Sequence, residues 1–208
     1  MAEATGPGGV LVLATHNAHK LRELRAILDA TGALGPLELV GAADVGVAAP
    51  TESGLTFAEN ALLKARQVAR ACGLPALADD SGLCVAALGG APGVFSARWA
   101  GGHGDDAANL ALLLDQLRDV SDADRRAWFE CAAALVTADG VESVETGRMP
   151  GRLTRAPRGE GGFGYDPILI PDPFAVTAAE LTAEQKNAIS HRGKAFRALS
   201  GAIRALWE

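Results

Sequence analysis

The stretch Leu74-Pro75-Ala76-Leu77-Ala78-Asp79-Asp80-Ser81-Gly82 ends an apolar run on two adjacent carboxylates. Residues 74–78 are typical of a buried strand, and successive side chains along a strand point to opposite faces. We therefore expect one carboxylate to hold a metal or a water while the other ties down the backbone. Acidic residues at the carboxyl end of a strand lie where α/β sheets bind ligands. An ordinary turn at Ser81-Gly82, followed by a second apolar run over 83–88, fits the same residues.

Composition restricts the class of protein. The 208 residues, 49% of them hydrophobic, suffice for a domain with its own core. We expect residues 1–9 to be a loose tail, without the features of a signal peptide, and residues 10–208 to form a single domain with two lobes. The formal net charge of -6 argues against binding to a nucleic-acid polymer or to an anionic membrane. No apolar run is long enough to span a bilayer.

The three cysteines are odd in number and far apart along the chain, at Cys72, Cys84 and Cys131. Their spacing matches no zinc site. The sequence therefore predicts reduced, buried thiols in a cytoplasmic protein.

A polar loop joins the first strand to the first helix. Residues 10–14 are an apolar strand, residues 15–20 are Thr-His-Asn-Ala-His-Lys, and a helix is expected to begin near Ala18. Free backbone N–H groups and the helix dipole favour a phosphate at such a place, and Lys20 adds a positive charge. A plain helix cap made by Thr15 or Asn17 is the alternative.

The next helix has a clear start signal. Thr56 and Glu59 form a capping box, and the helix is expected to run to about Cys72. Asn60 and Lys64 are four residues apart, on a face that points into a cleft or into water. Glu52, in the loop before this helix, is the kind of lone acid that is usually solvated.

Shorter patterns predict the remaining elements. A short strand is expected at 37–40 and a helix at 105–117. Residues 127–138 and 141–148 read as strands around the hairpin turn Asp139-Gly140. Residues 152–154 suggest a further short strand, and residues 168–170 a buried one. Trp99 fits a partner surface or local packing.

A glycine-rich stretch carries two aromatic residues. Residues 159–167 read Gly-Glu-Gly-Gly-Phe-Gly-Tyr-Asp-Pro. Glycines let the backbone approach a ligand closely, and Phe163 and Tyr165 offer a stacking face for a flat base. Asp166 is held extended by the following Pro167. A flexible loop with rings packed in the core is the alternative.

The last helix is expected to begin after a second capping box, Thr182 with Gln185, and to continue to about Leu206. Lys186, His191 and Arg192 lie early in it. They form either a solvated basic face or a set of donors for a base or a phosphate.

Together these features suit the binding and cleavage of a nucleoside triphosphate, in which cations neutralise phosphates and a carboxylate activates water. No GxxxxGK[ST] motif is present, so the chain is not an ordinary kinase or GTPase.

Six motifs, in this order, resemble the inosine triphosphate pyrophosphatase family, whose bacterial members are dITP/XTP pyrophosphatases. They are residues 15–20, Glu59-Asn60-Ala61 with Lys64, residues 79–82, residues 89–93, residues 162–167, and Lys186 with Ser190-His191-Arg192. His16 departs from the glycine that many members have.

The resemblance implies an α/β fold of two lobes around a long mixed twisted sheet flanked by helices, with the active site in the cleft between the lobes. It implies a homodimer that uses Mg²⁺. The implied reaction converts a nucleoside triphosphate and water into the monophosphate and pyrophosphate, with ITP, dITP and XTP preferred. Removal of deaminated purines from the nucleotide pool is the implied role.

The residues and the resemblance together assign roles. Asp80 is the predicted proton acceptor, assisted by Asp79 and Lys64, and Asp80 and Glu52 are the predicted metal ligands. The predicted substrate-binding residues are Thr15, His16, Asn17, Ala18, His19, Lys20, Ser81, Phe163, Gly164, Tyr165, Asp166, Lys186, His191 and Arg192. A pyrophosphatase for another unusual nucleotide, such as a modified pyrimidine, and a non-catalytic nucleotide sensor remain as alternatives.

Overall fold

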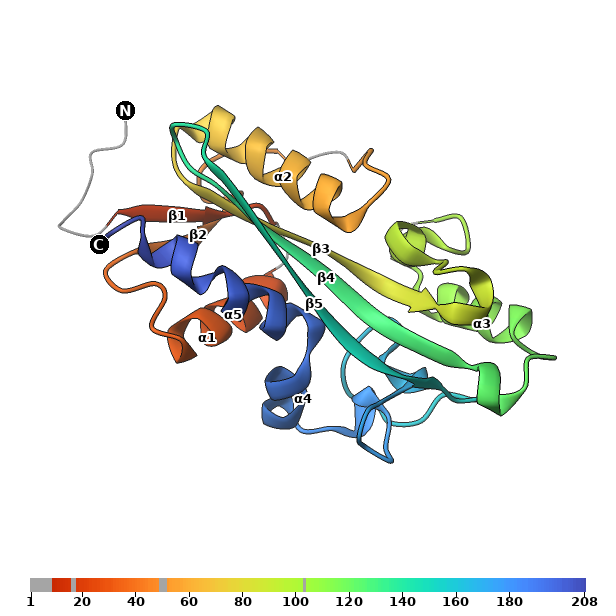
Figure 1. Cartoon of the computed structure of the whole chain (residues 1–208). Coiled ribbons are helices and arrows are strands. Elements are labelled where there is room, and N and C mark those ends of the chain that lie inside the picture. The colour runs from red at the N-terminus through yellow and green to blue at the C-terminus, as the bar shows by residue number, and fades with distance from the viewer. Residues whose placement is uncertain (1–8, 16–17, 49–51, 103) are drawn as a thin grey trace. The chain divides into compact units, whose positions relative to one another are not determined.

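The computed structural model describes residues 9–15, 18–48, 52–102 and 104–208. His16 and Asn17, both predicted phosphate-loop residues, lie outside them. The described chain has an α/β fold with a six-stranded sheet of order β2-β1-β3-β4-β5-β6 (Figure 1). The strands are β1 (Val10–Leu13), β2 (Glu38–Gly41), β3 (Ala76–Val85), β4 (Arg126–Val136), β5 (Glu142–Leu153) and β6 (Leu169–Pro171). The helices are α1 (Ala18–Ala30), α2 (Phe57–Cys72), α3 (Asp106–Gln116), α4 (Ala183–Ile189) and α5 (His191–Arg204).

The chain divides into two compact units. Unit 1 comprises Met1–Asp80, Ala132–Thr146 and Arg192–Glu208, and unit 2 comprises Ser81–Cys131 and Gly147–His191. Strands β3, β4 and β5 each supply residues to both units. The predicted α/β class, with a mixed sheet flanked by helices, is confirmed.

Unit 1 is built on parallel strands. β1 pairs in parallel with β2 and with β3. Helix α2 covers one face of these strands, and α1 and α5 cover the other (Figure 1). Trp207 fixes the C-terminal segment to the loop after α1, because its indole N–H donates to the carbonyl of Ala33 at 3.0 Å. The core contains Leu11, Leu13, Leu24, Leu28, Leu39, Ala61, Ala65, Val68, Phe196, Leu199 and Ile203.

Helix α2 begins and ends as its sequence predicts. The Thr56 hydroxyl accepts a hydrogen bond from the backbone N–H of Glu59 at 3.1 Å, and the Glu59 carboxylate accepts one from the N–H of Thr56 at 3.2 Å. Gly73 ends the helix in the left-handed conformation, with φ 71°.

Strand β3 corrects one prediction. The expected turn at Ser81-Gly82 is absent, and one ten-residue strand continues from Ala76 to Val85. Gly82 lies inside this strand, where a side chain would collide with the carbonyl of Gly93 and the hydroxyl of Ser96. Glycine is therefore needed here because a neighbouring segment of the chain approaches closely, and not because the backbone turns.

Unit 2 packs around α3 and the distal parts of the long strands. Its core contains Leu83, Val85, Leu113, Leu117, Ala127, Phe129, Met149, Leu153, Tyr165, Ile168 and Leu169. β6 pairs antiparallel with β5, with Arg152 opposite Ile170. The prediction of a separate strand at 152–154 was wrong, because β5 is twelve residues long and already includes Leu153.

The C-terminal helix is also shorter than predicted. The chain forms α4 and then α5, with extended Ser190 between them at φ -60° and ψ 146°. The capping box at Thr182 and Gln185 is present as expected. No Gly or Pro lies at the break after Ile189, but Ser190, just before α5, is a residue type favoured at a helix start.

Cys72, Cys84 and Cys131 form no disulfide; Cys84 and Cys131 are buried as predicted, whereas Cys72 is only half-buried. Burial, followed by the negative charge of Glu130, raises the pKa of Cys84 to about 11, so its thiol stays protonated. None of the helices in the described ranges is both long and apolar enough to cross a membrane.

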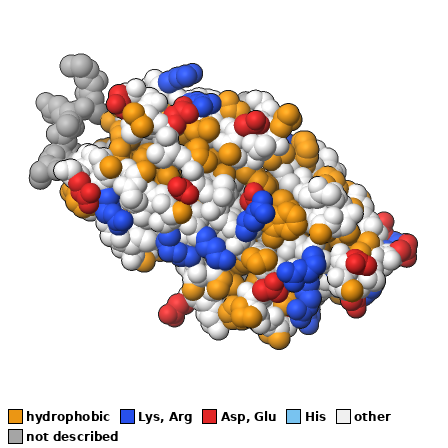
Figure 2. Space-filling view, in the orientation of Figure 1, with side chains coloured by type: hydrophobic (Ala, Val, Ile, Leu, Met, Phe, Trp, Pro, Cys, Tyr) orange, Lys and Arg blue, Asp and Glu red, His pale blue; other side chains and the backbone are white. Residues whose placement is uncertain are grey.

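The acidic excess of the composition does not make the visible surface uniformly acidic. Figure 2 shows Lys and Arg side chains interspersed with Asp and Glu side chains and with hydrophobic ones over the face in view. Such mixing means that the net charge of -6 gives little information about any one site on this face.

Candidate active site

Asp80 lies near the middle of β3 and faces helix α2. Its carboxylate accepts a hydrogen bond from the amide Nδ2 of Asn60 at 2.9 Å, and its Oδ1 lies 3.6 Å from Nζ of Lys64. Asn60 and Lys64 are four residues apart in α2, so one face of that helix supplies both partners. The alternative that this face points into water is wrong, because Asn60 and Lys64 are both buried.

Lys64 also binds Glu52. Its ammonium group donates to Oε1 of Glu52 at 2.7 Å. Burial works against the charge of Lys64, but Asp79, Asp80 and Glu52 outweigh it and raise its pKa above the ordinary value. Lys64 is therefore a fixed cation, and Glu52 is not the solvated acid that its loop position suggested.

The ionisation of Asp80 is unfavourable in this setting. Burial raises its pKa to about 6, and the charges of Glu52 and Asp79 act in the same direction. Lys64 and the hydrogen bond from Asn60 oppose this rise. Asp80 thus titrates close to neutral pH, as a general base requires.

Asp79 has a different set of partners. Its Oδ2 accepts a hydrogen bond from Nε of Arg192 at 3.0 Å, and Nη1 of Arg192 lies 3.1 Å from Oε2 of Glu23. Arg192 belongs to α5 and Glu23 to α1, which cover the face opposite α2 (Figure 1). The prediction that Asp79 and Asp80 face opposite ways is confirmed.

A second group of predicted residues gathers in unit 2. The Asp166 carboxylate accepts hydrogen bonds from the backbone N–H of Phe163 at 2.9 Å and from Nζ of Lys186 at 2.5 Å. The same ammonium group lies 5.1 Å from the centre of the Phe163 ring. Gly162, at φ 75°, permits this arrangement, because a side chain there would collide with the Asp166 carboxylate.

The two aromatic residues of the glycine-rich stretch have different surroundings. Phe163 is 56% exposed, whereas Tyr165 is 5% exposed and belongs to the core of unit 2. The Tyr165 hydroxyl donates to the carbonyl of Ser96 at 2.9 Å. Burial, then the charge of Asp106, raises the pKa of Tyr165 above its ordinary value, so the phenol stays neutral. The structure therefore favours core packing for Tyr165 and leaves Phe163 with an exposed ring.

The other predicted residues have defined positions along the chain. Thr15 follows β1 and is half-buried, while Ala18, His19 and Lys20 form the first turn of α1. Ser81 lies in β3, immediately after Asp80. His191 begins α5, and its ring stacks on Phe129 with the centroids 5.0 Å apart. The backbone N–H of Gly164 donates to the Asp106 carboxylate at 3.0 Å.

Hydrogen bonds and ion pairs thus join predicted residues into three sets. Asp80 with Lys64 and Glu52, and Asp79 with Arg192, lie in unit 1, and Asp166 with Phe163 and Lys186 lies in unit 2. Three side chains that bond to predicted residues were not themselves predicted: Glu23, Asn60 and Asp106. Asn60 had a signal, since it lies four residues before Lys64. Glu23 and Asp106 had none, because an acid within a polar helix face or a first helical turn is ordinary.

Comparison with known proteins decides the family. Residues 11–202 match the Ham1 family. The chain belongs to the Ham1 family. A dITP/XTP pyrophosphatase of Streptomyces coelicolor is 62% identical over 197 residues, which cover 94% of this chain and 98% of that protein.

Solved structures of Ham1 relatives show the same fold. The nucleoside-triphosphatase / dITP/XTP pyrophosphatase from Mycobacterium abscessus superposes with a TM-score of 0.77 at 50% identity, covering 91% of this chain and 98% of that one. A HAM1 protein from Coxiella burnetii superposes with a TM-score of 0.86 at 42% identity, covering 94% and 98%. The resemblance to bacterial dITP/XTP pyrophosphatases, inferred from six short motifs, is confirmed.

Proposed function

We propose that this Ham1-family chain is a nucleoside-triphosphate pyrophosphohydrolase that converts ITP, dITP and XTP into the monophosphate and pyrophosphate. The observation that carries the proposal is the group in unit 1 formed by the buried Asp80, Lys64 and Asn60 with the half-buried Glu52. A buried carboxylate with a pKa near 6 beside a fixed cation suits general-base chemistry on a phosphate. The name of the Streptomyces coelicolor relative supports the same reaction.

In the proposed reaction Asp80 accepts a proton from the water that attacks the α-phosphorus. A bond forms between the water oxygen and the α-phosphorus, and the bond from that phosphorus to the bridging oxygen breaks. Pyrophosphate leaves with the electron pair of the broken bond. Asp79 is a positioning residue in this scheme, because its contact with Arg192 fixes the strand that carries Asp80.

Lys64 and the loop after β1 are proposed to hold the triphosphate. Lys64 lies beside the proposed base and keeps its charge, so it can offset developing negative charge on the phosphate oxygens. Thr15 and the first turn of α1 supply donors at a helix N-terminus, which favours phosphate.

The unit 1 residues fit Mg²⁺. Glu52 and Asp80 bring two carboxylates to one cationic group, Lys64, so this set carries excess negative charge. Glu52 and Asp80 would hold the ion. Among the residues that the structure describes, no three His, Cys, Asp or Glu side chains could hold a metal alone. Mg²⁺ commonly uses one or two carboxylates and completes its shell with phosphate oxygens and water. When bound, it would neutralise charge on the phosphates.

Unit 2 is proposed to bind the purine. Phe163 presents an exposed ring for stacking, and Asp166 fixes both the Phe163 backbone and Lys186. His191 of unit 2 and Arg192 of unit 1 are proposed donors to the base or to the phosphates. A 6-keto purine offers an acceptor where adenine offers a donor. A site built to donate at this position can therefore reject adenine by about 10⁴-fold.

The proposal treats both units as one enzymatic domain that acts as a homodimer in the cytoplasm. The homodimer rests on the family resemblance, and the location rests on three cysteines that form no disulfide. Removal of deaminated purines from the nucleotide pool is the proposed role.

Release of pyrophosphate from a panel of nucleotides tests the function. ITP, dITP and XTP should yield pyrophosphate in the presence of Mg²⁺, and ATP should yield far less. GTP, which shares the 6-keto group, tests recognition at the 2-position. Preferred cleavage of a modified pyrimidine triphosphate would replace the substrate assignment, and binding of ITP without any product would indicate a nucleotide sensor.

Asp80→Asn tests the catalytic assignment on the same assay. Asn keeps the size of the side chain and can still accept from Asn60, but it cannot take a proton at neutral pH. Turnover of ITP should fall by about 10²-fold or more, the usual contribution of a general base. Asp119→Asn, at an exposed position after α3, is the matched control and should retain full activity. Unchanged turnover in a folded Asp80→Asn variant would remove Asp80 from the chemistry.

A further inference from the structure

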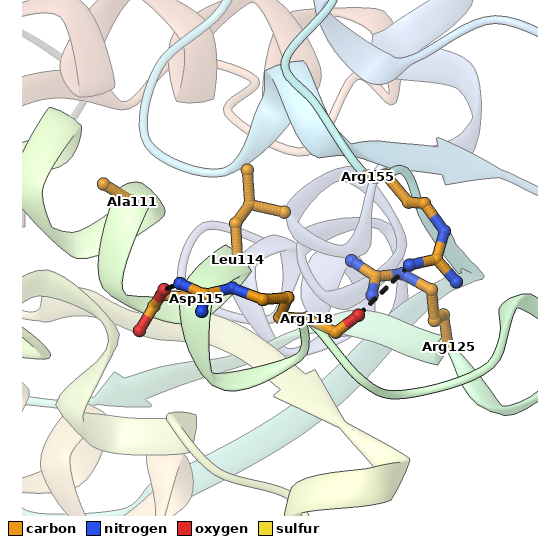
Figure 3. Close-up of a pocket in the computed structure, with 6 residues that line it drawn as sticks. All are labelled: Ala111, Leu114, Asp115, Arg118, Arg125 and Arg155. Atoms are coloured by element: carbon orange, nitrogen blue, oxygen red, sulfur yellow. Dashed lines mark hydrogen bonds and ion pairs between the residues drawn. The ribbon is translucent and has the colours of Figure 1, made fainter.

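A pocket of about 440 Å³ lies in unit 2, apart from every residue of the proposed function. Three of its lining residues are arginines, Arg118, Arg125 and Arg155, and one is an acid, Asp115. Leu114 and Ala111 complete the lining. Figure 3 shows that the guanidinium groups of Arg125 and Arg155 lie next to each other, while Arg118 and Asp115 lie toward the other side of the pocket.

Arg125 is the unusual member of this group, because it is a buried cation held only by neutral partners. It is 1% exposed, and its three hydrogen bonds go to backbone carbonyls: Nη1 to Leu117 at 2.7 Å, Nη2 to Thr154 at 2.8 Å and Nε to Leu153 at 3.2 Å. Within the part of the chain that the structure describes, no carboxylate forms an ion pair with it. A buried charge without an opposite charge is costly.

The neighbouring arginine increases this cost. Burial, followed by the positive charge of Arg155, lowers the pKa of Arg125, and the negative charge of Asp122 offsets only part of the effect. Two guanidinium groups side by side repel each other unless an anion lies between or beside them. The pocket has room for a small ligand, and three guanidinium groups against one carboxylate line it.

The other two arginines are fixed by contacts at the rim. Arg155 donates to the carbonyls of Arg118 and Val120, each at 3.2 Å, and pairs with Asp122 at 2.8 Å. Arg118 pairs with Asp115. Both ion pairs are exposed, and exposed pairs contribute little to stability. An entering anion can therefore replace either carboxylate at small cost.

We propose that the pocket lined by Arg118, Arg125 and Arg155 binds a small phosphate-bearing anion. The planar guanidinium group forms paired hydrogen bonds with phosphate oxygens, and it is the preferred side chain for such recognition. The anion would compensate Arg125 and relieve its repulsion with Arg155. This inference does not depend on the proposed hydrolase function, since it uses no residue of that site.

Nuclear magnetic resonance of the arginine side chains tests the proposal on the full chain. The Nε–H signal of Arg125 is followed during titration with sodium pyrophosphate in EDTA, so that no metal-dependent binding contributes. Inorganic phosphate and AMP form separate arms, which distinguish a free inorganic anion from a phosphorylated nucleotide. We expect a saturable shift of the Arg125 signal at millimolar pyrophosphate, and a weaker response when salt is added.

Two variants make the test specific. Arg155→Gln should weaken binding at least about tenfold, the effect of losing one charge-assisted hydrogen bond. Arg152→Gln removes one positive charge from an exposed position of β5 outside the pocket, and it should leave the affinity unchanged. The proposal is overturned if the Arg125 signal shows no saturable shift with any of the three anions. It is equally overturned if Arg155→Gln binds the anion as tightly as Arg152→Gln does. Arg125 would then only donate hydrogen bonds to backbone carbonyls.

Discussion

Replacing Asp80 by Asn should make the protein more stable above pH 6, although it removes the proposed base. Asp80 is buried in β3, and its pKa of about 6 shows that its negative charge is unfavourable in the folded state despite the contact with Lys64. A carboxyl group with a raised pKa binds its proton more tightly when folded than when unfolded. Its contribution to stability is therefore present below about pH 4 and is lost as the pH rises through about 6.

The expected change in the free energy of unfolding follows from the pKa shift of Asp80. Each pKa unit corresponds to about 1.4 kcal/mol, so a rise from the ordinary 3.8 to about 6 costs about 3 kcal/mol at pH 8. The Asn variant avoids this cost, and it retains a carbonyl oxygen for the hydrogen bond from Asn60. Lys64 keeps Glu52 as a partner at 2.7 Å. We expect a net gain of about 1–3 kcal/mol in the free energy of unfolding at pH 8, and little difference at pH 4.

Urea unfolding of the parent and of Asp80→Asn at several pH values between 4 and 8, in EDTA, measures this gain. Asp119→Asn serves as the control for loss of one acidic group from an exposed position. Added Mg²⁺ should stabilise the parent more than the Asp80→Asn variant, because a ligand stabilises the state that binds it. An Asp80→Asn variant that is less stable than the parent at pH 8, or that shows the parent's pH dependence, would refute the reasoning.

Three further outcomes are expected. Gly82→Ala should destabilise the protein by about 1–3 kcal/mol in thermal unfolding, because its methyl group would collide with Gly93, whereas Gly201→Ala, in open space within α5, should be neutral or stabilising. Thr56→Ala should cost about 1 kcal/mol by removing the cap of α2, with turnover at saturating ITP unchanged; loss of turnover would link that helix end to the chemistry. The value of kcat/KM should fall with decreasing pH below about 6, as Asp80 becomes protonated, and a profile flat down to pH 5 would exclude it as the base.

The fold was predictable where local signals were strong. Hydrophobic periodicity located β1, β2, α1, α2 and α3, and the capping boxes at Thr56 and Thr182 marked two helix starts within a residue. The error in β3 came from tertiary contacts. Gly82 has the composition of a turn but lies inside a strand, because the chain at Gly93 and Ser96 passes too close for any side chain.

In the candidate site too, local sequence patterns predicted some features, and tertiary contacts decided the others. The alternation of a strand was enough to predict that Asp79 and Asp80 face opposite ways, and the spacing of Asn60 and Lys64 placed them on one helix face. Whether Asn60 and Lys64 face water or a buried cluster could not be decided without their partner on β3, Asp80, which lies twenty residues from Asn60 along the chain. Tyr165 shows the reverse case, since its ring was predicted for a ligand but packs in the core beneath Ser96.

The continuity of β3 through its carboxylates has a consequence for how this chain can vary in length. Neighbouring positions of a strand alternate between faces, so gaining or losing one residue upstream of Asp79 within β3 would send each acid to the wrong helix. Asp79, which now contacts Arg192, would then face Asn60, and Asp80, which now contacts Asn60, would face Arg192. Spacing within this strand is consequently as restrictive as residue identity, whereas the hairpin turn at residues 137–141 can accept extra residues without exchanging the two acids.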